Sequence, residues 1–107
     1  MPSRAMEASA AARRAEEVLH LVGLADRAGV RAGILTLSER RRLEVARALA
    51  LDPHIVLLDE VMAGLIPSEV SEIVGIIRQI RDEGHTFLMI EHVMQAVMSL
   101  AETAYVL

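Results

Sequence analysis

The apolar residues of the chain follow two spacings, and each spacing predicts a different kind of element. Apolar positions at i, i+3, i+4 and i+7 predict a helix that begins at Pro67 and ends at Gly84. The residues on its apolar face are Val70, Ile73, Val74, Ile77 and Ile80. Two largely apolar runs on either side of this helix, residues 54–59 and 86–91, predict two buried strands.

Two further helices are predicted before the first strand. Residues 4–23 are rich in Ala and Glu, and residues 38–51 contain few helix breakers after Ser38, a candidate N-cap. Glycines between these helices predict loops or short helical turns up to about residue 35. The expected apolar face of the first helix comprises Val18, Leu21 and Val22, with Leu19 beside them. That of the second helix comprises Leu43, Ala46 and Ala50, with Leu49 beside them.

The C-terminal part of the chain continues the alternation of strand and helix. Residues 93–100 predict a short helix, and residues 103–107 predict a third strand. Strand–helix–strand–helix–strand order favours parallel strands joined by right-handed crossovers. The chain is therefore predicted to be α/β, with the loops after Asp59 and Glu91 at one edge of the sheet.

Four polar residues are expected at that edge, where α/β proteins commonly bind ligands. The first strand ends in Asp59 and Glu60, and the second ends in Glu91 and His92. An apolar run that ends in Asp-Glu has the form of a Walker B motif, in which the Asp helps to hold Mg²⁺ and the Glu can take a proton from water. Each residue alone has a structural alternative, since Glu60 and Glu91 could cap helices and His92 could be structural.

The segment LTLSERRRLEVARALALDPHIVLLDEVMAGL, residues 35–65, resembles the ATP-binding cassette (ABC) family from its signature loop to its D-loop. EHVMQAVM, residues 91–98, resembles the family's switch-histidine segment. GLADRAG, DEVMAGL and EHVMQAV are similar to the ATPases of branched-chain amino acid importers. The resemblance covers roughly residues 15–107, and it implies the C-terminal part of a P-loop NTPase domain.

The resemblance also implies a role for each matching residue. Asp59 would hold Mg²⁺ largely through water, Glu60 would be the catalytic base, and His92 would contact the γ-phosphate. The signature loop, which would lie against ATP on a second subunit, comprises Leu35, Thr36, Leu37, Ser38 and Glu39. The D-loop comprises Ala63, Gly64 and Leu65.

Several residues depart from the family's pattern. The usual LSGGQ is LTLSE here, so Leu37 and Ser38 replace two glycines that allow close approach to a phosphate. Val61 stands where Pro is common, and Ile66 where Asp or Asn is frequent. His54 and His85, at the opposite ends of the two strands, are predicted to be structural.

The composition sharpens this picture because all 11 basic residues are Arg and none is Lys. No GxxxxGK[ST] string occurs, so the chain lacks the P-loop that holds phosphates. Neither aromatic residue, Phe87 or Tyr105, is placed to stack on adenine. We therefore expect two segments of one partial ATPase domain, residues 1–52 (signature) and 53–107 (catalytic), that do not hydrolyse ATP alone.

The expected partners are a second ATPase subunit, identical or different, and transmembrane permease subunits. Residues 1–50 hold nine Arg against six acids and residues 51–107 two Arg against nine, a charge pattern unlike that of a nucleic-acid binder. The absence of cysteine excludes disulfides, and no apolar run is long enough to span a membrane. The expected location is cytoplasmic, on the inner face of the plasma membrane.

Two other interpretations stay open. The chain could be a non-catalytic interaction module that docks on a partner ATPase subunit. It could also be the ATPase head of a DNA-repair or chromosome protein, although no heptad run of a coiled coil is present.

Overall fold

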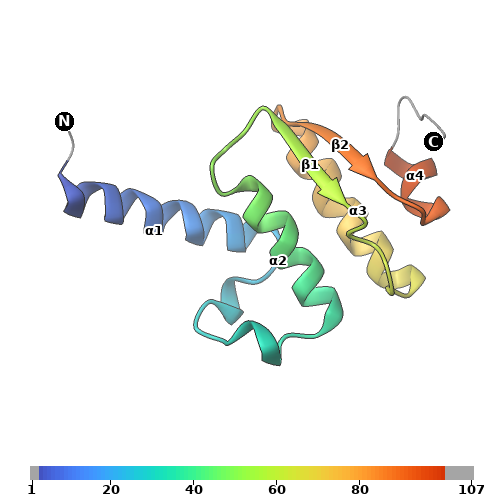
Figure 1. The fold of residues 1–107 in the computed structure, drawn as a ribbon, viewed down its shortest axis with the longest axis horizontal. Coiled ribbons are helices and arrows are strands. Elements are labelled where there is room, and N and C mark those ends of the chain that lie inside the picture. Colours follow the sequence, from blue (N-terminus) through green and yellow to red (C-terminus); the bar gives the residue numbers. More distant parts are fainter. Residues whose placement is uncertain (1–2, 101–107) are drawn as a thin grey trace.

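A computed structural model describes residues 3–100 of the chain (Figure 1). The helices and strands in chain order are α1 (Arg4–Leu21), the 3₁₀ turns η1 (Ala25–Arg27) and η2 (Ala32–Ile34), α2 (Leu37–Leu49), β1 (Ile55–Asp59), α3 (Pro67–Asp82), β2 (Thr86–Ile90) and α4 (Met94–Leu100). Each predicted helix and the first two predicted strands are present within a few residues of their expected bounds. The third strand, at residues 103–107, lies outside the described residues.

The two strands form a parallel pair, as predicted from the strand–helix–strand order. Ile55 lies opposite Thr86 and Asp59 lies opposite Ile90, so both strands end at the same edge. Helix α3 is the crossover between them and covers one face of the sheet (Figure 1).

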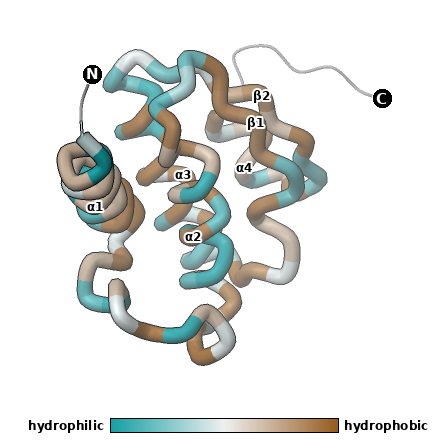
Figure 2. The backbone as a smooth tube through the Cα atoms, turned by 60° about the vertical axis from the view of Figure 1, so that its left-hand side comes forward, coloured by the Kyte–Doolittle hydropathy of each residue, from teal (hydrophilic) through white to brown (hydrophobic). Residues whose placement is uncertain are grey.

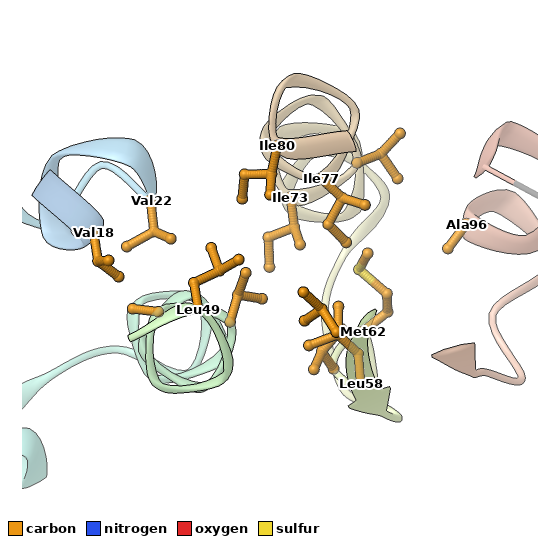
Figure 3. Close-up of a cluster of buried hydrophobic side chains, with 14 of the residues drawn as sticks. Val18, Val22, Leu49, Leu58, Met62, Ile73, Ile77, Ile80 and Ala96 are labelled. Atoms are coloured by element: carbon orange, nitrogen blue, oxygen red, sulfur yellow. The ribbon is translucent and has the colours of Figure 1, made fainter. Parts of the chain in front are cut away.

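The core lies between α3 and the elements packed around it, namely α1, α2, β1 and α4. All five predicted apolar residues of α3 are buried. Figure 3 shows Ile73, Ile77 and Ile80 pointing from α3 toward Leu49 of α2 and Leu58 of β1. Pro67 stands in the first turn of α3, and Gly84 follows its C-cap with φ +105°. A Pro at the start and a left-handed Gly after the end account for the length of this helix.

The two strands face the core on one side only. Val56 and Leu58 point into the core, whereas the other face of the sheet carries apolar side chains that are 45–65% exposed. These exposed residues are Ile55, Leu57, Leu88 and Ile90. Both strands are strongly hydrophobic along their length (Figure 2), although α3 covers only one side of them.

Helix α2 begins earlier than predicted. Its N-cap is Thr36, whose hydroxyl accepts a hydrogen bond from Glu39 N, while the Glu39 carboxylate accepts one from Thr36 N. This reciprocal pair is a capping box, and it takes precedence over Ser38, which lies inside the helix and is buried. The buried face includes Ala46 and Leu49, as predicted, and differs from the prediction because Val45 is also buried and Ala50 is exposed.

Helix α1 is attached to the rest of the chain near its C-terminal end. Val18 and Val22 are buried, while the N-terminal half of the helix is exposed and extends away from the core (Figure 1). Arg14 donates to Leu49 O at 2.8 Å and pairs with Asp52. No helix among residues 3–100 is long and apolar enough to cross a membrane.

His85 lies at the start of β2, and its Nδ1 is 2.7 Å from Pro53 O. Its Nε2 is 3.4 Å from Asp52 Oδ1, and the side chain is largely buried. These contacts join the starts of the two strands, in agreement with the structural role predicted for His85.

Candidate functional site

The register of the sheet brings the loops after β1 and β2 together. Asp59 is the last residue of β1, and Glu60 N donates to Ile90 O at 2.7 Å, which extends the backbone pairing by one residue. Glu91 and His92 follow directly on the other strand. The four polar residues expected at this edge therefore lie at the end of β1 and in the two adjacent loops.

Glu60 and His92 face each other across these loops. His92 Nε2 lies 3.0 Å from Glu60 Oε1, and the two side chains are 79% and 48% exposed. Glu60 has φ +52°, in the left-handed region that a residue with a Cβ seldom adopts. Ala63 N donates to Glu60 O at 3.2 Å and closes the turn that holds this conformation. Backbone strain at a catalytic or ligand-binding residue is common, because the surrounding structure imposes it.

Asp59 lies exposed beside this pair. Among residues 3–100, no three His, Asp or Glu side chains lie close enough together to form a metal site from protein ligands alone. Mg²⁺ at phosphate-transfer sites commonly takes one or two carboxylates and completes its shell with water and phosphate oxygens. Asp59 fits that limited role, and it does not fit a metal site made of protein ligands alone.

Glu91 contacts more of the site than its sequence position indicated. Its Oε1 accepts hydrogen bonds from His92 N at 3.0 Å and Val93 N at 3.2 Å, and its Oε2 accepts one from Met62 N at 3.3 Å. The bonds to residues 92 and 93 agree with the capping alternative. The bond to Met62 crosses to the loop after β1 and was missed, although the predicted sheet already placed the two loops together.

The segment expected to form the signature loop is partly buried, and two of its residues are hydrogen-bonded to each other. Leu35 and Ser38 are buried, and Thr36 and Glu39 form the capping box. The backbone N–H of Thr36 donates to the Glu39 carboxylate and lowers its pKa below the ordinary value. Arg27 adds to this effect, since its Nε lies 2.9 Å from Glu39 Oε2.

This segment contacts the residues expected to form the D-loop. Arg41 donates to Ala63 O at 3.1 Å. Gly64 has φ +81°, and a Cβ placed on it would lie 3.0 Å from Leu37 Cδ2. Leu65 N closes the turn by donating to Met62 O at 3.2 Å. The start of α2 and the loop after β1 are therefore adjacent within one chain.

Two of the three arginines at the start of α2 have partners, as expected for cations at that end of a helix. Arg42 pairs with Glu72 of α3, and Arg41 pairs with Glu44 in addition to Ala63 O. These contacts attach α2 both to α3 and to the loop after β1.

The part of the chain that runs from α1 through β1 to the loop after it matches a known family. The family model described as "ABC transporter" matches residues 2–63, more than half of the chain. The chain belongs to the ABC transporter family. The observed α/β arrangement is accordingly that of part of a P-loop NTPase domain of the ABC type.

Similar proteins extend this assignment over nearly the whole chain. The high-affinity branched-chain amino acid transport ATP-binding protein LivG of Escherichia coli (strain K12) is 39% identical over 106 residues, which cover 98% of this chain and 42% of LivG. The lipopolysaccharide export system ATP-binding protein LptB of Acidithiobacillus ferridurans is 43% identical over 89 residues, 83% of this chain and 36% of LptB. The chain thus spans less than half the length of these relatives.

Solved structures agree with the fold. The ADP conformation of MJ1267, an ATP-binding cassette of an ABC transporter, superposes with a TM-score of 0.76 at 28% identity. The match covers 82% of this chain and 35% of that chain. The helices and the parallel strands therefore keep the arrangement of an ABC cassette although the chain spans only part of one.

Proposed function

We propose that this chain supplies the hydrolytic residues of an ABC transporter ATPase. The observation that carries the proposal is the contact of 3.0 Å between His92 Nε2 and Glu60 Oε1 at the edge where both strands end. A carboxylate that can take a proton and an imidazole that can donate one meet there, next to Asp59. These groups can deprotonate an attacking water and help to hold Mg²⁺, whereas the P-loop that holds the phosphates would come from outside this sequence.

In the proposed reaction, water attacks the γ-phosphorus of ATP while the bond from that phosphorus to the bridging oxygen breaks. Glu60 accepts the proton that the attacking water loses, and His92 donates a hydrogen bond to a γ-phosphate oxygen. The products are ADP and phosphate. Asp59 would hold Mg²⁺ largely through water, and the ion would offset the negative charge of the phosphates.

The signature loop of residues 35–39 would contact ATP bound to a second ATPase subunit, and residues 63–65 would carry contacts across that dimer. The start of α2 supports this role because a helix N-terminus favours an anion. Leu37 and Ser38 bring side chains where the family usually has Gly, so we propose that backbone N–H groups make this contact.

We further propose that the ATPase acts on permease subunits in the membrane, at the cytoplasmic face, and that the cargo is a branched-chain amino acid. The similarity to LivG supports this cargo. LptB, which is named for lipopolysaccharide export, is similar at a comparable identity. Uptake of a labelled branched-chain amino acid by the assembled transport system tests this cargo, and absence of uptake would contradict it.

The proposal is tested by replacing the matching part of E. coli LivG with this chain. In that chimera, Glu60→Gln should lower ATP turnover by about 10²-fold or more, because general-base catalysis is lost, and leave the Kd of ATP unchanged. Glu83→Gln, a matched change at the exposed end of α3, should leave both values unchanged. Undiminished turnover in the Glu60→Gln chimera would remove Glu60 from the mechanism.

The 107-residue chain by itself should neither bind Mg-ATP at micromolar concentration nor hydrolyse it, because it has no Lys and no P-loop. Isothermal titration calorimetry measures this directly, and micromolar affinity would contradict the expectation. The alternative of a non-catalytic docking module is supported by the exposed apolar face of the sheet. A docking module would change the ATP turnover of a partner ATPase to the same extent in the unmutated chain and in Glu60→Gln.

A further inference from the structure

We infer that Glu91 is a positioning residue that ties the loop after β2 to the loop after β1 and thereby holds His92 against Glu60. The inference rests on the proposed function for its importance, and on three hydrogen bonds for its geometry. One carboxylate oxygen accepts from His92 N and Val93 N, and the other accepts from Met62 N on the opposite loop. A single side chain therefore joins both loops of the site.

The pair of Glu60 and His92 needs such support because it is exposed. The side chains are 48% and 79% exposed, and a polar contact between exposed side chains contributes little to holding its own geometry. Glu60 also has a left-handed backbone, which neighbouring contacts must maintain. The orientation of the two side chains thus depends on how firmly their loops are joined.

Met62, which donates the hydrogen bond across the two loops, is fixed in place by the core. Its side chain is fully buried, and Figure 3 shows it in the core below α3, beside Leu58. Within residues 3–100, Glu91 is the one hydrogen-bond acceptor of Met62 N. The bond from Glu91 therefore connects the exposed loop of His92 to a residue that the core holds in place.

A simpler role for Glu91 is to cap the turn before α4. The bonds from His92 N and Val93 N span only one and two residues, and they alone would suffice for that role. The bond from Met62 N has no part in capping, because it comes from 29 residues away in the chain. A test must therefore separate the bond across the loops from the two local bonds.

Glu91→Gln makes this separation. The amide keeps the shape of the side chain but offers one acceptor oxygen, and its NH₂ group would face an N–H donor on the other side. Gln can thus satisfy one loop but not both. If the amide oxygen of Gln faces residues 92 and 93, it still accepts both of their hydrogen bonds. We therefore expect the bond from Met62 N to be lost.

The experiment is NMR of the isotopically labelled 107-residue chain. In Glu91→Gln, hydrogen exchange of the Met62 amide should accelerate by about tenfold or more, as expected for loss of a bond to a charged acceptor. The ¹⁵N shifts of the His92 ring should move toward those of Glu60→Ala, in which the pair is removed. Amides of α3 should keep their protection, and Glu83→Gln should leave all these signals unchanged.

Unchanged exchange at Met62 in Glu91→Gln, or faster exchange with unchanged His92 ring shifts, would overturn the inference in favour of simple capping. If the variant does not fold, the unmutated chain provides a second measurement. A scalar coupling across the hydrogen bond, from Met62 ¹⁵N to the Glu91 carboxylate carbon, is expected, and its absence would overturn the inference. Neither measurement involves ATP, so its outcome is independent of the turnover of the chimera.

Discussion

Gly64 offers a sharp test of the geometry at the junction of the signature segment and the loop after β1. Gly64 has φ +81°, and a Cβ on it would meet Leu37 Cδ2 at 3.0 Å. Gly64→Ala therefore introduces both an unfavourable backbone conformation and a close contact. The same substitution at Gly75, inside α3, meets nothing within 4 Å and has no positive φ.

The expected changes have opposite signs. A left-handed conformation costs a residue with a Cβ about 1–2 kcal/mol. Loss of chain entropy in the unfolded state offsets about 0.4–1 kcal/mol of this. The Leu37 contact adds only a little, because the end of a partly exposed Leu can move. Gly64→Ala should thus lower the free energy of unfolding by about 1 kcal/mol, whereas Gly75→Ala should raise it by about 0.5–1 kcal/mol.

Thermal unfolding followed by circular dichroism at low protein concentration measures the difference. For a chain of this size, about 1 kcal/mol corresponds to a Tm change of roughly 4–8 °C. Gly84→Ala, with φ +105° and open space around it, measures the backbone cost without the Leu37 contact. If Gly64→Ala raised the Tm as Gly75→Ala does, the backbone assigned to this loop would be wrong.

Two further predictions concern the cap of α2 and the open face of the sheet. Because its folded-state pKa is lowered, Glu39 should stabilise the chain above the ordinary Glu pKa of about 4.3 and lose this effect as the pH falls through the folded value. Glu39→Gln keeps the capping box but removes the charge. The urea midpoint of this variant should therefore lie below that of the unmutated chain at pH 7 and equal it at acid pH. A difference that stays constant with pH would contradict the lowered pKa of Glu39. The exposed apolar face of the sheet should make the chain self-associate, and Leu57→Thr with Leu88→Thr should reduce this in size-exclusion chromatography with little change in Tm, since both side chains are exposed. Ile77→Ala, at a buried position, should instead cost about 2–5 kcal/mol of stability. Self-association that persists in the double variant would show that the contact between copies does not involve this face of the sheet.

Helix α3 and the parallel strands were predictable because burial against one neighbour imposes a regular spacing on a sequence. The five apolar residues of α3 all face the core, and Pro67 and Gly84 mark its ends through backbone rules that need no tertiary contact. The same local chemistry predicts the parallel pairing, since strand–helix–strand order leaves few alternatives.

The predictions were less exact where two residues could each cap the same helix, and where apolar runs do not show which face of a strand is covered. Thr36 and Ser38 are both good N-caps, and the reciprocal bonds of Thr36 with Glu39 decide between them. The apolar runs predict two buried strands but do not indicate which element covers each face, and α3 covers the face of Val56 and Leu58.

The geometry of the site could be predicted only in part because it depends on contacts between loops. Spacing along the chain placed Asp59, Glu60 and His92 at one edge, and the register of the strands then set the contact of 3.0 Å. The left-handed conformation of Glu60 and the bond from Met62 N to Glu91 have no periodic signature, because each depends on a turn that two strands impose together. Sequence patterns thus identify which groups meet at such an edge, whereas their orientation depends on the few hydrogen bonds that join one loop to the next.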